Sequence, residues 1–209
     1  MTELHEDTKK ALKLNLDNLV QETTLKASQL SLFKFVGINK SITMELFSQN
    51  IEEYLNFMVS SYITTNFSTG LKKTLTEFSE LLIKLQGGQL LTNSDPCDLT
   101  FSLKNNTQYW LEIKSINDLN YSTISSIKEH KALAEKNERI YRLFIYDSNE
   151  NLFDEEYKLN GNEFWELIAG FKNAETELFL IINGAANKLS LSSLIKETHT
   201  RLLNEWRMH

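Results

Sequence analysis

The sequence predicts an α/β (α+β) protein in which helices flank a central mixed β-sheet. Three observations predict this class. Helical periodicity dominates the first 85 or so residues, an alternating apolar and polar pattern follows Gly87-Gly88, and helical and apolar strand-like segments then alternate to the C-terminus. At 209 residues and 41% hydrophobic composition, the chain is long enough to bury one sizeable core.

The N-terminal part is expected to be helical. Between Thr2 and about Thr24, leucines recur at helical intervals among charged residues. A second helix is predicted with Ser41 as a candidate N-cap and an apolar stripe from Ile51 to Met58. A third, with apolar positions from Leu71 to Leu85, is expected to end at Gly87-Gly88.

The remaining elements follow from changes in period. They are a short strand in GQLLTNS, two alternating runs within SDPCDLTFSLKNNTQYWLEIKS (residues 94–115), a helix over 122–137, a strand over Ile140–Tyr146, a short helix over Asn162–Phe171, a buried strand over Leu178–Ile182 and a closing helix over Ser190–Trp206.

The two alternating runs predict a hairpin whose register depends on the turn. An odd-length loop puts the aliphatic residues of both runs on one face, and their burial at ~1.5 to 3 kcal/mol each outweighs turn preference. We therefore expect a three-residue loop with Asn106 in the left-handed conformation, Asp98 opposite Lys114 and Thr100 opposite Glu112.

This register gathers Asp98, Glu112 and Lys114 on the polar face of the hairpin. Two neighbouring carboxylates repel unless a cation lies between them. Hard oxygen ligands of this kind suit Mg²⁺, which completes its coordination with water and phosphate oxygens. A lysine on the same face could orient or activate water and stabilise charge developing on a phosphate.

The series Asp95-Pro96-Cys97-Asp98, a hairpin turn, then Glu112-Ile113-Lys114 resembles the active-site signature of the PD-(D/E)XK nucleases, the restriction-endonuclease-like superfamily. The resemblance covers roughly residues 70–147. It implies Mg²⁺ ligation by Asp98, Glu112 and the Ile113 carbonyl, with Lys114 serving the attacking water. An acidic residue of the preceding helix, Glu80 or as a second choice Glu77, would join them.

One departure from that signature leaves an alternative open. The proline precedes Asp98 by two positions rather than one, so Asp95 is a rival for the acidic role. Asp98 is preferred because it begins the alternating run, whereas Asp95 belongs to the approaching turn.

The resemblance implies a Mg²⁺-dependent endonuclease that cuts double-stranded DNA, most like a type II restriction endonuclease. Residues 67–209 would form the catalytic core, and residues 1–66 an N-terminal helical region that serves as a dimer surface in a homodimer. A repair or junction-resolving nuclease is the alternative within the superfamily. A noncatalytic acidic adaptor is the alternative from another class.

Composition narrows the remaining possibilities. The net charge of -6 argues against nonspecific polyanion binding, and a single cysteine excludes an internal disulfide. The four histidines are scattered, so no structural zinc is expected, and no nucleotide-binding motif is present. Without a signal peptide or apolar span, the chain is expected to be soluble and cytoplasmic, in a reducing environment.

Some residues have two interpretations. Ser125, Lys128 and Lys131, on the helix over 122–137, could contact DNA phosphates or form a solvated helix face. His130 is expected to be a surface histidine, since no partner residue can be assigned to it. Cys97 is expected to be a small core residue.

Overall fold

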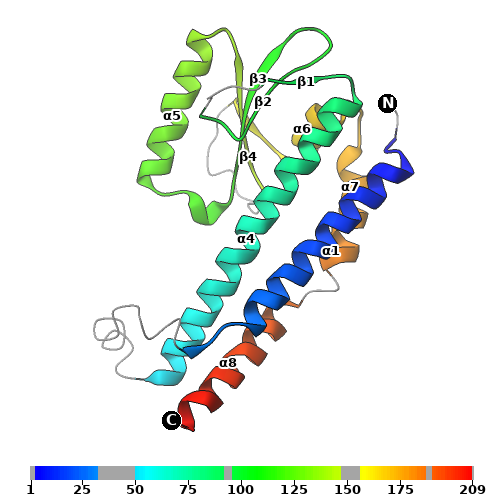
Figure 1. Cartoon of the computed structure of the whole chain (residues 1–209). Coiled ribbons are helices and arrows are strands. Elements are labelled where there is room, and N and C mark those ends of the chain that lie inside the picture. The colour runs from blue at the N-terminus through cyan, green and yellow to red at the C-terminus, as the bar shows by residue number, and fades with distance from the viewer. Residues whose placement is uncertain (1–2, 33–49, 92–95, 147–155, 187–189, 209) are drawn as a thin grey trace. The chain divides into compact units, whose positions relative to one another are not determined.

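The computed structural model describes residues 3–32, 50–91, 96–146, 156–186 and 190–208 (Figure 1). Within these residues the protein is an α/β protein with a five-stranded mixed sheet. Two residues considered above, Ser41 and Asp95, lie outside the described ranges. None of the helices described is long and apolar enough to cross a membrane.

The chain divides into two compact units. The first comprises Met1–Leu12 and Lys72–Ile181 and contains the sheet; the second comprises Lys13–Leu71 and Ile182–His209. Helices α1 (Glu6–Ser28) and α4 (Ile51–Leu85) contribute residues to both. The second unit therefore overlaps the predicted region 1–66 but also includes C-terminal residues, and no helix ends at residue 66.

Helix α4 replaces two helices of the sequence-based prediction. Its first amides, those of Glu52 and Glu53, donate to Asn50 Oδ1 at 3.1 and 3.4 Å. It ends as predicted at Gly87-Gly88, where Gly87 has a φ of 86° and the Gly88 amide donates to the Ile83 carbonyl at 2.8 Å. Because no proline interrupts residues 51–85, both apolar stripes continue into one helix.

The sheet has the strand order β1 (Gln89–Leu90), β2 (Leu99–Ser102), β3 (Gln108–Lys114), β4 (Ile140–Ile145) and β5 (Lys158–Leu159). The first three strands are antiparallel, while β4 is parallel to both β3 and β5. Helix α5 (Tyr121–Lys136), capped by the Asn120 side chain, supplies the crossover that a parallel β3–β4 pair requires.

The hairpin register differs from the predicted one by two residues. Thr100 pairs with Trp110, not Glu112, because residues 103–107 form the loop. The Leu103 amide donates to the Thr107 carbonyl at 3.0 Å and closes this longer loop. The predicted odd length is confirmed, as is the left-handed conformation of Asn106, with φ of 61°. Because the number of loop residues is still odd, the aliphatic residues of both strands still share one face.

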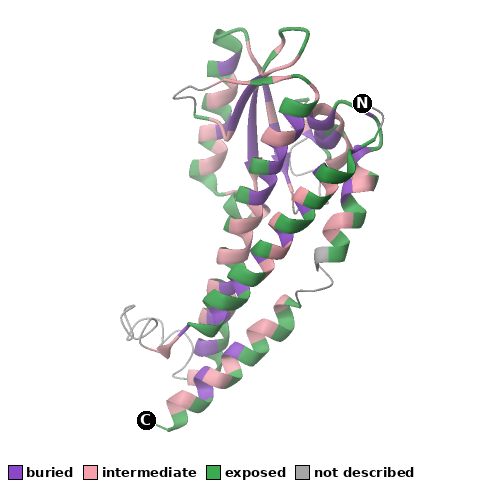
Figure 2. Cartoon of the chain, turned by 45° about the vertical axis from the view of Figure 1, so that its right-hand side comes forward, coloured by how far each residue is buried: buried purple, intermediate pink, exposed green. Residues whose placement is uncertain are grey.

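Both faces of the hairpin are buried (Figure 2). Phe144 of β4 lies on the aliphatic face beside Ile113 and stacks on Phe164 of α6 (Gly161–Ala169), with ring centroids 3.8 Å apart. The opposite face, which carries the polar residues of the hairpin, packs against α5 through Trp110 and Ile127. Trp110 is therefore covered by α5.

The predicted strand over Leu178–Ile182 is wrong, because these residues belong to α7 (Ala174–Ala186). Leu178 is buried, but Phe179 and Leu180 are 57% and 72% exposed. An apolar run of this length does not distinguish a strand from a helix. The closing helix is confirmed as α8 (Leu191–Arg207), with Ser190 as its N-cap.

Candidate functional site

The site is built around Glu112, a buried carboxylate on β3. Glu112 is 1% exposed and lies on the face that α5 covers. Its Oε1 atom lies 3.0 Å from Lys114 Nζ. Its Oε2 atom accepts a hydrogen bond from the Tyr141 hydroxyl of β4 and lies 3.3 Å from His130 Nδ1 of α5. Lys114 and the Tyr141 hydroxyl thus compensate the charge of one buried carboxylate, as burial of a charge requires.

Asp98 lies beside the same segment of β3, immediately before β2. Its Oδ2 atom accepts a hydrogen bond from the Ile113 amide at 2.8 Å. Its Oδ1 atom lies 2.8 Å from Nζ of Lys72 on α4. The hydrogen bond ties Asp98 to the residue between Glu112 and Lys114.

The electrostatics of the site are visible in two pKa shifts. Burial by itself would lower the pKa of Lys114, but Glu112, through charge and a hydrogen bond, together with Asp98 and Asp118, raises it above its ordinary value. Burial raises the pKa of the Tyr141 hydroxyl strongly, and the charge of Glu112 and the hydrogen bond to it add to the rise. Lys114 is therefore protonated and Tyr141 neutral at neutral pH.

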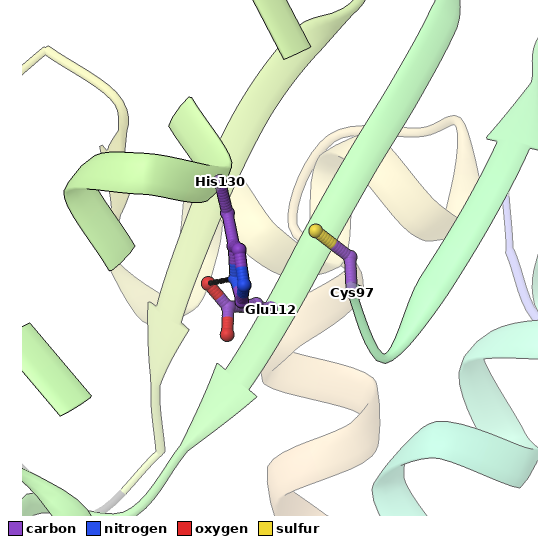
Figure 3. A group of neighbouring side chains, drawn as sticks. All are labelled: Cys97, Glu112 and His130. Atoms are coloured by element: carbon purple, nitrogen blue, oxygen red, sulfur yellow. Dashed lines mark ion pairs between the residues drawn. The ribbon is translucent and has the colours of Figure 1, made fainter. Parts of the chain in front are cut away.

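The structure corrects the interpretation of two residues. His130 is not a simple surface histidine, since its side chain is 22% exposed and Nδ1 faces Glu112. Cys97 is half-buried, and its Sγ lies within 4.8 Å of ligand atoms of both Glu112 and His130 (Figure 3). These residues are 15 and 18 positions apart along the chain, so only the fold brings them together.

The donor set fits a divalent cation. Both oxygens of Asp98 and both of Glu112 lie against positive or hydrogen-bond-donating groups, and the charged ones among these are Lys72 and Lys114. The Ile113 carbonyl points to the same strand edge as its amide, which Asp98 accepts, since both groups of a strand residue face one neighbour. Two carboxylates and a carbonyl are the hard oxygen ligands that Mg²⁺ takes.

The structure places the other predicted site residues as follows. Glu80 is half-buried on α4, and Glu77 is exposed and paired with Lys73 at 3.7 Å. Among the described residues, neither belongs to a cluster of metal-ligating side chains. Ser125 and Lys128 are exposed on α5. Lys131 lies 3.1 Å from Glu135 and stacks over the Tyr157 ring at 5.5 Å.

A basic pocket of about 530 Å³ lies beside the site. Tyr141, whose hydroxyl contacts Glu112, also lines this pocket. The pocket is further lined by the cationic residues Lys131, Arg139 and Arg142, the acidic residues Glu135 and Glu156, and Ile140 and Tyr157. Three cations against two carboxylates give it a locally positive balance in a chain whose net charge is -6.

Sequence reasoning missed Lys72 and Tyr141. Lys72 reaches Asp98 from a helix 26 positions earlier, and only the packing of α4 reveals this. Tyr141 lies in the predicted strand after α5. Its hydroxyl is a polar group within a mostly apolar sequence, and this was the one signal that it forms a buried hydrogen bond.

In comparisons with protein-family models and with curated proteins, no match to this chain was found.

Proposed function

We propose that the protein is a Mg²⁺-dependent nuclease of the restriction-endonuclease-like kind, acting on DNA. The observation that carries the proposal is that Asp98 accepts a hydrogen bond from the Ile113 amide, while Glu112 and Lys114, on either side of Ile113, form an ion pair. The order α4, β1, β2, β3, α5, β4, with β1–β3 antiparallel and β4 parallel, supports it, because the sequence resemblance implies the same order of elements.

Asp98, Glu112 and the Ile113 carbonyl would hold the cation. Mg²⁺ bound there would supply positive charge beside the scissile phosphate and acidify a neighbouring water. The chain's own part is to fix the two carboxylates. The Tyr141 hydroxyl holds Glu112 from the side of β4, while the Ile113 amide holds Asp98.

Lys114 would contribute positive charge beside the phosphate. With no ion bound, Glu112 raises the pKa of Lys114 despite its burial, so the ammonium is protonated at neutral pH. A protonated lysine cannot accept a proton from water, but it stabilises negative charge that develops on a phosphate. Its side chain is 19% exposed, which leaves it in reach of a substrate.

The basic pocket gives the DNA backbone a second point of attachment. Arg139 and Arg142 would pair with phosphates, since guanidinium groups suit that geometry. Of the residues predicted to contact DNA, Lys131 lines this pocket, whereas Ser125 and Lys128 do not. In a homodimer, two such sites would cut both strands.

The test is DNA cleavage with matched variants. Purified protein is incubated with Mg²⁺ and supercoiled plasmid, genomic DNA, single-stranded DNA and a branched junction, which together cover the restriction and repair alternatives. We expect cleavage by the wild type and by Lys73→Ala, which removes an exposed lysine of α4. Asp98→Asn and Lys114→Ala should each lose about 100-fold or more.

Two results would overturn the proposal. Cleavage that persists in Asp98→Asn and Lys114→Ala would come from another site or a contaminant. Intact DNA of all four kinds, with folded wild-type protein, would favour the noncatalytic adaptor.

A further inference from the structure

We infer that Cys97, Glu112 and His130 form a binding site for a transition-metal ion of the zinc type, which shares Glu112 with the proposed Mg²⁺ site and differs from it in its other ligands. One ligand atom from each of the three residues lies within 4.8 Å of the others. In the part of the chain that the structure describes, this is the one such group of three metal-ligating side chains.

The spacing of two of the ligands already suits one ion. A histidine nitrogen and a carboxylate oxygen, each about 2.0 to 2.1 Å from a tetrahedral zinc ion, lie about 3.3 Å apart. Glu112 Oε2 and His130 Nδ1 are 3.3 Å apart. A thiolate at about 2.3 Å from the ion lies about 3.5 Å from each of the others. Cys97 Sγ, within 4.8 Å, therefore needs a movement on the order of 1 Å.

A second observation points to a cation at this place. His130 Nδ1 is buried and makes no hydrogen bond, although it faces a carboxylate oxygen. A buried nitrogen without a hydrogen-bond partner is costly. A metal ion between the two atoms removes that cost.

The chemistry of the donors selects the metal. Thiolate and imidazole favour Zn²⁺ and similar ions, and they suit Mg²⁺ poorly. The thiolate of Cys97 and the carboxylate of Glu112 together neutralise a divalent charge. The Tyr141 hydroxyl, which donates to Glu112 Oε2, acts as the outer hydrogen bond that orients a metal-ligating carboxylate. Three protein ligands leave a fourth position for water.

The sequence does not predict this site, because its three residues are far apart along the chain. Cys97 precedes β2, Glu112 is on β3 and His130 is in the middle of α5, so no short spacing motif joins them. Figure 3 shows the three side chains directed toward one region from these three elements.

The experiment measures metal binding directly. Wild-type protein is titrated with Zn²⁺ by calorimetry, and with Co²⁺ while sulfur-to-cobalt charge-transfer absorption is recorded. We expect one ion per chain, a thiolate-cobalt band, and affinity that falls about 100-fold or more in Cys97→Ser and in His130→Ala. Asp98→Asn should bind Zn²⁺ within about threefold of the wild type, because Asp98 is outside the ligand set.

Circular dichroism establishes that each variant is folded. Wild-type protein that binds no Zn²⁺, or Cys97→Ser and His130→Ala variants that bind it as tightly as the wild type, would overturn the inference. In the second case, the ion would be held by histidines elsewhere on the chain. The outcome is independent of nuclease activity, since Asp98→Asn separates the two sites: it should abolish cleavage and retain zinc.

Discussion

Replacement of Lys114 by alanine should destabilise the protein because it leaves Glu112 with less compensation. The Glu112 side chain is 2% exposed and lies 3.0 Å from Lys114 Nζ. Removing one partner of a buried ion pair costs about 3 to 5 kcal/mol. The Tyr141 hydroxyl still donates to Glu112, so we expect a smaller loss, about 2 to 3 kcal/mol in the free energy of unfolding.

The assay is urea denaturation at neutral pH, followed by tryptophan fluorescence in a Trp206→Phe background. The remaining tryptophans, Trp110 and Trp165, are both buried in the unit that contains the sheet. Lys73→Ala is the matched control, since its ion pair spans 3.7 Å with side chains 75% and 52% exposed. That variant should lose about 0.5 kcal/mol or less.

A double variant separates lost charge compensation from lost packing. Glu112→Gln with Lys114→Met removes both charges and keeps similar volumes, so it should lie within about 1 kcal/mol of the wild type. If Lys114→Ala costs no more than Lys73→Ala, or if the double variant is as unstable as the single one, the electrostatic account of Glu112 is wrong.

Three further predictions concern local features. The raised pKa of Tyr141 means that the folded state keeps a proton that the unfolded state releases near pH 10, so unfolding free energy should fall as pH rises above about 10; Tyr141→Phe should flatten that decline, and an unchanged slope would contradict it. Asn106→Gly should stay within about 0.5 kcal/mol of the wild type while Asn106→Val loses about 1 to 2 kcal/mol, because φ is 61° there; equal stabilities would refute this. Arg201 donates hydrogen bonds to the Ala27 and Leu30 carbonyls at 3.1 and 2.8 Å, so Arg201→Ala should lower the free energy of unfolding by about 1.5 to 3 kcal/mol. Thermal or urea unfolding measures this loss, and an unchanged stability would contradict the role of these two bonds.

The sequence predicted elements whose signals are local. Two glycines predict the end of α4 at Gly87-Gly88. The spacing of apolar residues predicts the crossover helix α5 and strand β4. All three predictions are confirmed. The hairpin parity was also predictable, because only an odd loop buries Leu99, Phe101 and Leu111 together. The shift of the register by two residues was not predictable, because three-residue and five-residue loops place the same residues on the same face.

The errors came from features that depend on packing. Leu178–Ile182 is apolar enough for a buried strand, and its helical state becomes evident only from the exposure of Phe179 and Leu180. Likewise, alternation predicted a polar face around Glu112, but not that α5 covers that face. Helix α5 also carries His130 to within 3.3 Å of Glu112. Because the packing of α5 on this face was not predicted, the contact between His130 and Glu112 was not predicted either.

The most direct test of the central claim is the rate of DNA cleavage measured against Mg²⁺ concentration for the wild type and Asp98→Asn. Carboxylates held beside Lys114 on β3 predict a rate that saturates with Mg²⁺ in the wild type and falls about 100-fold or more in the variant. Equal rates in the two proteins, or a rate independent of Mg²⁺, would contradict the assignment of this site.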